Sequence, residues 1–222
     1  MKGSLYIVAT PIGNLEDITL RAIKILSEAD IILAEDTRVT SKLSSRYKIP
    51  KSIVGYHQHS SEGKKYEILK HLLERKNIVL VTDAGTPGIS DPGNELVDFI
   101  RDKDSTVKII PVPGPSALTA ALSVSGFRCD KFVFLGFLPK KKRTKLFNWL
   151  KEGKFTFAFF ESPNRIEKSL DVLEEVFGGE TRVFIGRELT KIYETLYTGT
   201  IQETKERFKG KVKGEIVVVV EL

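Results

Sequence analysis

The 222-residue sequence contains only one cysteine, Cys129, and three histidines. A single cysteine excludes an internal disulfide framework and a zinc site built from paired cysteines. We therefore expect a protein of a reducing compartment, the cytoplasm. His57 and His59 flank Gln58, but no third ligand lies nearby in the sequence, so we interpret this segment as a polar loop and expect no metal site.

Long apolar runs are also missing. No stretch approaches the roughly 18 apolar residues that a membrane-spanning helix needs. The first apolar run, residues 5–9, is shorter than the ~7–15-residue core of a signal peptide, and Pro11 follows it closely. We expect neither membrane insertion nor secretion.

The net charge of +6 is concentrated in one segment, residues 138–154. This segment contains one acidic residue, Glu152, and seven basic residues, so its excess of positive charge equals that of the whole chain. The basic residues are Lys140, Lys141, Lys142, Arg143, Lys145, Lys151 and Lys154. Clustered cations attract polyanions, and the nearby rings of Phe147 and Trp149 are of the kind that stack on unpaired bases. The segment predicts contact with nucleic acid; the alternative is a solvated loop and helix whose aromatic rings face the core.

Short apolar runs alternate with amphipathic stretches in the first half of the chain. Strands are expected at residues 5–9, 31–34, 53–56, 78–82 and 107–110, and helices at 18–27, 37–47, 63–74 and 94–101. Asp17 is the expected N-cap of the first helix. The alternation predicts an α/β fold with a mostly parallel sheet covered by helices on both faces. Ligands of such sheets bind beyond the carboxyl ends of the strands.

A proline cluster at residues 111–115 marks the expected domain boundary. Three prolines in five residues cannot continue a central strand or a helix, so we expect α/β domains at residues 1–113 and 114–222. In the second domain, helices are expected at 116–123, 144–151 and 166–176, and strands at 131–135, 156–160, 182–187, 192–198 and 215–221. The strands at 182–187 and 192–198 are too close for a helical crossover, so this sheet is expected to be mixed.

Three loops at predicted strand ends are rich in glycine and proline: residues 10–14, 83–93 and 111–117. Glycine lets the backbone approach a ligand closely and proline restricts the path of a loop, so these loops suit a flat, partly apolar ligand. They contain neither the G-x-G-x-x-G turn of dinucleotide-binding proteins nor a P-loop. Each loop taken singly can be explained as a tight turn, but three such loops at one sheet edge predict a binding site.

Acidic and basic residues follow three of the predicted strands in a similar order. They are Glu35, Asp36 and Arg38; Glu161 and Arg165; and Arg187 and Glu188. Asp36 or Thr37 can also cap the next helix, and each pair of opposite charges can be an ordinary surface ion pair. Their shared position at strand ends favours a functional role.

Seven short strings occur in order along the chain. They are ATPIGNLEDIT (residues 9–19), AEDTR (34–38), DAGTPGISDPG (83–93), PVPGPSA (111–117), GFLP (136–139), ESPNR (161–165) and RELTK (187–191). One string would be weak evidence, but together they resemble the tetrapyrrole methylase superfamily over nearly the whole chain. The resemblance is greatest to the branch that methylates a cytidine ribose 2′-hydroxyl in 16S ribosomal RNA of the small subunit.

The resemblance implies two α/β domains that enclose S-adenosylmethionine, and a homodimer. The residues that match cofactor contacts are Ile12, Gly85, Thr86, Ile89, Ser90, Ser116, Ala117 and, less directly, Phe160. Gly85-Thr86-Pro87 matches the family's G-D-P turn with Thr86 in place of the acid. A carboxylate role therefore does not transfer to Thr86.

The implied reaction is displacement at a sulfonium methyl group by a ribose oxygen. Such a reaction needs precise alignment and an acceptor for the hydroxyl proton. The candidate bases are Glu35, Asp36, Glu161 and Glu188, and the sequence does not choose among them. The candidate RNA-binding residues are Arg38, Lys140, Lys141, Lys142, Arg143, Arg165 and Arg187.

Two other functions stay open at this point. The first is a methyltransferase acting on a tetrapyrrole ring, because that substrate is acidic and also suits a basic surface. The second is a non-catalytic ribosome-assembly factor that binds RNA and keeps the fold as a scaffold, because fold alone does not prove activity. The compact basic segment favours an RNA methyltransferase over the first, and the intact small-residue loops favour it over the second.

Overall fold

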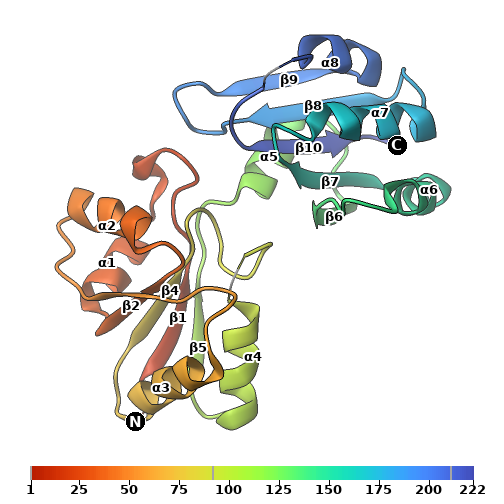
Figure 1. The fold of residues 1–222 in the computed structure, drawn as a ribbon. Coiled ribbons are helices and arrows are strands. Elements are labelled where there is room, and N and C mark those ends of the chain that lie inside the picture. Colours follow the sequence, from red (N-terminus) through yellow and green to blue (C-terminus); the bar gives the residue numbers. More distant parts are fainter. Residues whose placement is uncertain (1, 92, 211) are drawn as a thin grey trace. The chain divides into compact units, whose positions relative to one another are not determined.

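The computed structural model of the protein describes residues 2–91, 93–210 and 212–222. The chain divides into two compact units, one ending at Ser116 and one beginning at Ala117, which are described separately below (Figure 1). The sequence predicts the boundary between residues 113 and 114, within the same connecting segment. Each unit contains a sheet covered by helices, as the α/β prediction requires.

In its described part, the first unit is built on a five-stranded parallel sheet in the order β3-β2-β4-β1-β5. The strands are β1 (Ser4–Val8), β2 (Ile31–Ala34), β3 (Ile53–Gly55), β4 (Ile78–Val81) and β5 (Lys108–Val112). The helices are α1 (Leu20–Glu28), α2 (Thr37–Arg46), α3 (Glu62–Leu73) and α4 (Asn94–Lys103), and a 3-10 turn, η1 (Leu15–Asp17), precedes α1. This architecture confirms the predicted parallel sheet.

The helices cover both faces of this sheet because the direction of the crossovers reverses after β3. Right-handed crossovers place α1 and α2 on one face and α3 and α4 on the other. One core contains Leu26 of α1 and Val79 of β4, and the other contains Leu72 of α3 and Leu80 of β4. Successive residues of β4 therefore face opposite layers, and the whole strand is buried.

Two local predictions for this unit are wrong. The first helix begins at Leu20, and its N-cap is Thr19, whose Oγ1 accepts a hydrogen bond from the backbone N of Ala22 at 3.0 Å. Asp17 instead belongs to the 3-10 turn. The strand expected at residues 107–110 extends to Val112, so Pro111 lies within β5, where it pairs with Ile7. Because β5 is an edge strand, the missing N–H of the proline is tolerated there.

In its described part, the second unit contains a mixed sheet in the order β6-β7-β10-β8-β9, in which β6 and β7 are parallel and the other neighbours antiparallel. The strands are β6 (Phe132–Phe137), β7 (Thr156–Glu161), β8 (Arg182–Arg187), β9 (Thr195–Thr200) and β10 (Ile216–Val220). The helices are α5 (Ala117–Ser125), α6 (Arg143–Gly153), α7 (Ile166–Phe177) and α8 (Ile201–Arg207). Side chains of α6, α7 and α8 share one core with the sheet, while α5 packs against β10 and β8. The predicted mixed sheet is confirmed.

The second unit differs from prediction at β9 and α8. Ile192 and Tyr193, read as the start of a strand, are 94% and 75% exposed and lie in the turn before β9. Helix α8 was not predicted because it is short and mostly charged. It starts at a capping box in which Thr200 and Glu203 satisfy each other's backbone N–H groups.

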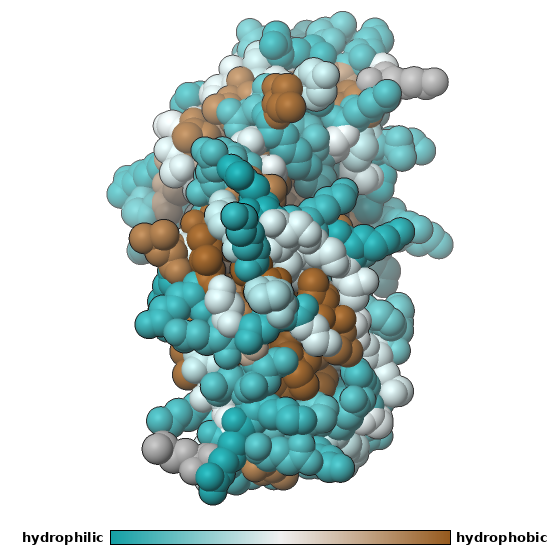
Figure 2. All heavy atoms as spheres, turned by 90° about the vertical axis from the view of Figure 1, so that its left-hand side faces the viewer, coloured by the Kyte–Doolittle hydropathy of each residue, from teal (hydrophilic) through white to brown (hydrophobic). Residues whose placement is uncertain are grey.

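Among the described residues, we find no helix with the length and hydropathy required to cross a membrane. The face of the molecule in Figure 2 is largely hydrophilic, with hydrophobic residues gathered in patches between polar ones. Other apolar residues form the interior, for example in strands β4 and β10, in which every residue is buried.

Candidate functional site

The loops that follow β1 and β4 are joined at the carboxyl edge of the first sheet. The backbone N of Thr10 donates to the carbonyl of Gly85 at 2.9 Å, and the N of Gly85 donates to the carbonyl of Thr10 at 3.0 Å. Thr10 Oγ1 also donates to the carbonyl of Thr82 at 3.1 Å. Gly85 has φ of +81°, a conformation that only glycine adopts readily. The two loops therefore form one continuous wall.

The loop after β5 joins the same wall. Thr86 Oγ1 donates a hydrogen bond to the carbonyl of Pro115 at 3.3 Å. A carboxylate has no proton to donate, so this contact gives Thr86 a structural reason to replace the acid of the family turn. Gly114 lies so close to the end of β1 that a Cβ added to it would be 3.1 Å from the Cβ of Ala9.

The predicted cofactor residues divide into groups in the structure. Ile12 is buried and lies beside Gly85, because a Cβ added to Gly85 would be 3.6 Å from Ile12 Cγ2 and 3.8 Å from the Pro115 carbonyl. Thr86 belongs to the same cluster through its bond to Pro115, and Ser116 follows Pro115 directly. Ile89 and Ser90 are exposed on the outer part of the β4–α4 loop. Ala117 and Phe160 belong to the second unit, in α5 and β7.

The outer part of the β4–α4 loop is held by Asp91. Asp91 Oδ1 accepts a hydrogen bond from the backbone N of Gly88 at 2.6 Å. Gly88 and Gly93 have φ of +87° and +149°, and Ser90 has +68°. Burial raises the pKa of Asp91 to about 6, and the hydrogen bond from Gly88 offsets only part of this effect. The loop is thus shaped by a carboxylate whose charge is costly in the folded state.

We expect Asp91→Asn to stabilise the protein by about 1 kcal/mol near neutral pH, because the amide keeps an acceptor oxygen and removes a half-buried charge. The folded-state pKa of about 6 exceeds the ordinary value of 3.8. The contribution of this group to the free energy of unfolding is therefore fully present below pH 3.8 and is lost as the pH rises through about 6. Urea unfolding of both proteins at about pH 8 and about pH 4 checks this. The advantage of the variant should vanish at the lower pH, and a pH-independent difference would contradict the assignment.

Acidic residues from β2 and β4 gather at the same edge of the sheet. Asp83 Oδ1 accepts a hydrogen bond from the backbone N of Asp36 at 2.9 Å. Burial raises the pKa of Glu35, and the negative charges of Asp83 and Asp36 raise it further. Among the described residues, no basic side chain lies within ion-pair distance of Glu35.

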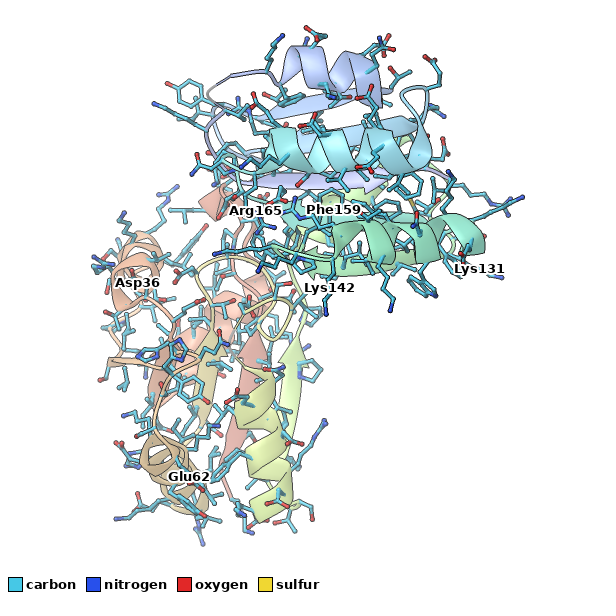
Figure 3. All side chains as sticks on the ribbon, turned by 45° about the vertical axis from the view of Figure 1, so that its right-hand side comes forward. Asp36, Glu62, Lys131, Lys142, Phe159 and Arg165 are labelled. Atoms are coloured by element: carbon cyan, nitrogen blue, oxygen red, sulfur yellow. The ribbon has the colours of Figure 1, made fainter. Side chains whose placement is uncertain are left out.

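Asp36 differs from Glu35 in having committed partners. It is the N-cap of α2, as predicted, and its Oδ1 accepts a hydrogen bond from the backbone N of Arg38 at 2.8 Å. The guanidinium of Arg38 binds both carboxylate oxygens, and this hydrogen bonding lowers the pKa of Asp36 to about 2. The Arg38 side chain is 86% exposed, so the N–H groups that Asp36 does not engage face solvent. Figure 3 labels Asp36 beside α2.

In the second unit, Glu161 is completely buried and surrounded by hydrogen-bond donors. Its Oε1 accepts from the backbone N of Ser162 at 2.8 Å and lies 3.3 Å from Arg165 Nε. Its Oε2 accepts from Ser169 Oγ at 2.5 Å and lies 3.6 Å from Arg143 Nη2. Both carboxylate oxygens thus face hydrogen-bond donors and cations within the second unit. The geometry therefore gives Glu161 a structural role.

Arg143 and Arg165 extend this cluster into the segment between β6 and α6. Arg143 Nε donates to the carbonyl of Pro139 at 2.7 Å, and Arg165 Nη2 donates to that of Leu138. Both arginines are therefore engaged with the protein, whereas the lysines that directly follow Pro139 are exposed. Figure 3 labels Arg165, which directly precedes α7, and Lys142, which directly precedes α6.

Arg187 and Glu188 brace the loop between β8 and β9. Arg187 donates to the carbonyls of Lys213 and Tyr193 at 2.9 and 3.0 Å. Glu188 Oε1 accepts from Lys191 Nζ and from the backbone N of Glu215, both at 2.9 Å. Hydrogen bonds from Lys191 and Glu215 outweigh burial and lower the pKa of Glu188. This carboxylate is accordingly better suited to holding the loop than to accepting a proton.

A basic hollow of about 520 Å³ adjoins Arg187. Its cationic lining residues are Arg187, Arg207, Lys209 and Lys213. The guanidinium of Arg207 lies over the ring of Tyr197, 4.8 Å from its centroid. In the described part of the chain, no cluster of three or more His, Cys, Asp or Glu residues is arranged to hold a metal ion. His57 instead accepts a hydrogen bond from the backbone N of His59 through Nδ1 at 3.2 Å.

The profile of the family described as Tetrapyrrole (Corrin/Porphyrin) Methylases matches residues 4–205. The chain belongs to the tetrapyrrole methylase family. The chain is 48% identical to a protein of Thermotoga maritima, aligned over 98% of this chain and 97% of that protein. A protein of Bacillus subtilis is 43% identical over 99% of this chain and 75% of its own length. Both are named Ribosomal RNA small subunit methyltransferase I.

Solved structures of tetrapyrrole methylases share the fold. The methyltransferase CobJ aligns with a TM-score of 0.75 at 17% identity, over 99% of this chain and 94% of its own. Uroporphyrin-III-C-methyltransferase from Thermus thermophilus aligns with a TM-score of 0.67 at 18% identity, over 98% and 94%. At these identities the likeness establishes the fold alone. The predicted family and fold class are confirmed.

Sequence reasoning missed two acidic residues that shape the candidate site. Asp83 and Asp91 lie in the β4–α4 loop, and the sequence analysis assigned neither a role of its own. Their signal was visible, because each is an acid among the small residues of the glycine- and proline-rich loop that follows β4. Their contacts with Asp36 and Gly88 depend on how the loops fold and cannot be read from spacing.

Proposed function

We propose that this protein transfers a methyl group from S-adenosylmethionine to the 2′-hydroxyl of a cytidine ribose in 16S ribosomal RNA. The proposal depends chiefly on relatives that are 41–48% identical over nearly the whole chain and are named Ribosomal RNA small subunit methyltransferase I. Two features of this chain agree with it. The joined loops of the first sheet suit a partly apolar donor, and the basic segment at residues 138–154 suits a polyanionic substrate.

The carboxyl edge of the first sheet is the proposed site of S-adenosylmethionine. Ile12, Gly85 and Pro115 border a small space that an added Cβ would enter, and its lining consists of apolar and backbone groups. We propose that Ile12, Gly85, Thr86 and Ser116 hold the donor, with Ile89, Ser90, Ala117 and Phe160 as further contacts. When bound, S-adenosylmethionine supplies an electrophilic methyl group on a sulfonium.

Glu35 is the proposed acceptor of the ribose proton. A general base is most effective when its pKa approaches the working pH, and both burial and neighbouring carboxylates raise the pKa of Glu35. Asp36 is held by Arg38, Glu161 by two arginines, and Glu188 by Lys191. Among the described residues, Glu35 is therefore the one candidate of the four whose carboxylate has no ion-pair partner.

The RNA-binding candidates have separate roles in this proposal. Lys140, Lys141 and Lys142 are exposed and available to phosphates, as are Arg38 and the basic hollow beside Arg187. Arg143 and Arg165 position the lysine segment through their bonds to backbone carbonyls. We further propose that the protein acts in the cytoplasm, in keeping with its single cysteine, and as a homodimer, in keeping with the family resemblance.

The function is tested by incubating the purified protein and isotopically labelled S-adenosylmethionine with small ribosomal subunits from cells that lack its gene. We expect label on the ribose of one cytidine in 16S RNA, located by mass mapping. A parallel reaction contains precorrins as acceptors. Methylation of precorrins alone would establish a tetrapyrrole substrate, and donor binding without transfer to either acceptor would indicate an assembly factor.

Donor binding is tested separately with Gly85→Ala. A side chain at φ of +81° strains the backbone that bonds to Thr10, and we expect the Kd for S-adenosylmethionine to rise about tenfold. Gly178→Ala is the matched control, because Gly178 has φ of +91° with nothing within 4 Å and lies at the end of α7. Calorimetric titration should show normal binding for the control. Equal losses in both variants would contradict the site.

A further inference from the structure

We propose that α6 and its two ends form a docking surface for single-stranded RNA, with the indole of Trp149 as a base-stacking platform. The identity of the biological partner as ribosomal RNA rests on the proposed function, but RNA binding by this surface can be measured without any methylation. The surface is defined by Trp149, Phe155 and the five exposed lysines Lys140, Lys141, Lys142, Lys145 and Lys154.

The platform is an aromatic pair at the C-terminal end of α6. Trp149 is 51% exposed and Phe155 is 38% exposed, and their ring centroids are 5.6 Å apart at an interplanar angle of 39°. Phe147 has no exposed surface, so it belongs to the core and the expectation that it stacks on bases is wrong. A half-exposed indole supported by a second ring offers a surface on which an unpaired base can stack.

The fold sets this aromatic pair in place before any ligand arrives. A Cβ on Gly153 would be 2.1 Å from Phe155 Cε2, so the phenyl ring lies directly over the last turn of α6. The chain reverses at Lys154, whose φ is +51°. The backbone N of Phe155 donates to the carbonyl of Leu150, and that of Lys154 to the carbonyl of Lys151, both at 3.2 Å. This is the Schellman pattern, which fixes the position of the residue after the reversal.

The surrounding lysines have no acidic partners. Among the described residues, none of the five exposed lysines forms an ion pair within the protein. Lys151, by contrast, is tied to the carbonyl of Val176. Five cations without ion-pair partners, spread along α6 and its ends, and an exposed aromatic pair match the phosphates and bases of a nucleic acid strand.

Two of these lysines occupy positions where folding favours glycine. Lys142 and Lys154 flank α6 with φ of +64° and +51°, and lysine adopts this left-handed conformation reluctantly. Lys142 is also the N-cap of α6 and makes no capping side-chain bond. Cations near a helix N-terminus are unfavourable as well. Backbone conformation therefore does not favour lysine at either end of α6.

The surface is long enough for several nucleotides. Helix α6 has 11 residues, and at about 1.5 Å per residue it extends about 16 Å between the lysines at its start and the aromatic pair at its end. Figure 3 places the labelled Lys142 and Lys131 toward opposite ends of this helix. Stacking on Trp149 requires an unpaired base, so the strand must be single-stranded where it meets the indole.

The first test uses intrinsic fluorescence, because Trp149 is the only tryptophan of the chain. Titration with a short single-stranded oligoribonucleotide should quench this fluorescence, whereas polyglutamate of equal charge should not. Quenching by both polyanions alike, or by neither, would overturn the stacking platform. Methylation of ribosomal subunits without RNA-induced quenching would leave the proposed function intact and refute this inference alone.

The second test measures RNA affinity by anisotropy of a labelled oligoribonucleotide. We expect Trp149→Ala to weaken binding about tenfold and Trp149→Phe to restore most of it. Lys142→Gly and Lys154→Gly should fold at least as stably as the wild type, bind RNA less tightly, and each reduce the salt dependence of binding by about one phosphate contact.

Lys48→Gly is the matched control for the lysine variants. Lys48 is also exposed and left-handed, with φ of +53°, but it follows α2 in the first unit. This variant should retain normal RNA affinity. If it loses as much affinity as Lys154→Gly, the effect comes from net charge and the proposed surface is wrong.

Discussion

Replacing Glu35 by glutamine is expected to lower the rate of methyl transfer by about 10²–10⁴-fold while leaving donor binding unchanged. The amide cannot accept the ribose proton, but it keeps the size of the side chain. Because burial and the charges of Asp83 and Asp36 raise the pKa of Glu35, neutralising this residue should not destabilise the fold. Single-turnover rates with saturating donor measure the effect on the chemical step.

The pH profile distinguishes a base from a residue that only shapes the site. The wild-type rate should fall as the pH drops through the raised pKa of Glu35, because the protonated acid no longer accepts a proton. In Glu35→Gln this acid limb should disappear. Asp98→Asn, which changes an exposed acid of α4, serves as the control and should retain the wild-type profile. A Glu35→Gln rate within a few fold of wild type would mean that alignment alone drives the reaction.

Replacing Glu161 by alanine is expected to lower the free energy of unfolding by about 3–5 kcal/mol. The carboxylate has no exposed surface and lies between Arg143 and Arg165. Its removal leaves the charge of Arg143, whose side chain is 11% exposed, without a partner and also leaves a cavity. Burial already lowers the pKa of Arg143, which shows how costly its charge is at this position. Urea unfolding at pH near 7 provides the measurement.

Two further variants make this result interpretable. Glu161→Gln keeps an oxygen for the Ser162 backbone N–H and should cost less than the alanine variant, while still losing the charge. Glu175→Ala removes an exposed acid from α7 and should change the free energy of unfolding by less than about 0.5 kcal/mol. A loss below about 1 kcal/mol for Glu161→Ala would show that the arginines find other partners. RNA affinity should also fall in Glu161→Ala, because Arg143 and Arg165 hold the segment that carries Lys140–Lys142.

Glu161 also shows where sequence reasoning fails at a site. In the sequence it resembles Glu35, since each acid follows a buried strand and precedes an arginine. The structure separates them, because Glu161 is enclosed by Arg143, Arg165 and Ser169, and Arg143 and Ser169 come from α6 and α7. A spacing pattern cannot tell a buried ion cluster from an open carboxylate. The distinction depends on which side chains the tertiary fold brings to each oxygen.

Helix α8 and Pro111 show the same limit for secondary structure. The capping-box spacing of Thr200 and Glu203 was visible in the sequence. A helix this short and charged has no clear apolar face in the sequence, and its apolar side is defined only when Ile201 and Phe208 pack into the core of the second unit. Pro111 is acceptable in β5 only because that strand lies at the edge of its sheet. Strand order is a long-range property, and local pattern does not contain it.

The family and the α/β fold class were predictable from the sequence alone, and the sequence also predicts a binding site at the carboxyl edge of the first sheet. The family resemblance follows from seven short strings in order along the chain. The fold and the loops follow from hydrophobic periodicity and from glycine and proline positions, which are local properties of the chain. Which charged side chains have ion-pair partners became visible only in the folded protein, because pKa and accessibility depend on neighbours distant in sequence. The structure accordingly separates Glu35 from the three engaged acids, and the open lysines around Trp149 from the arginines that hold them in place.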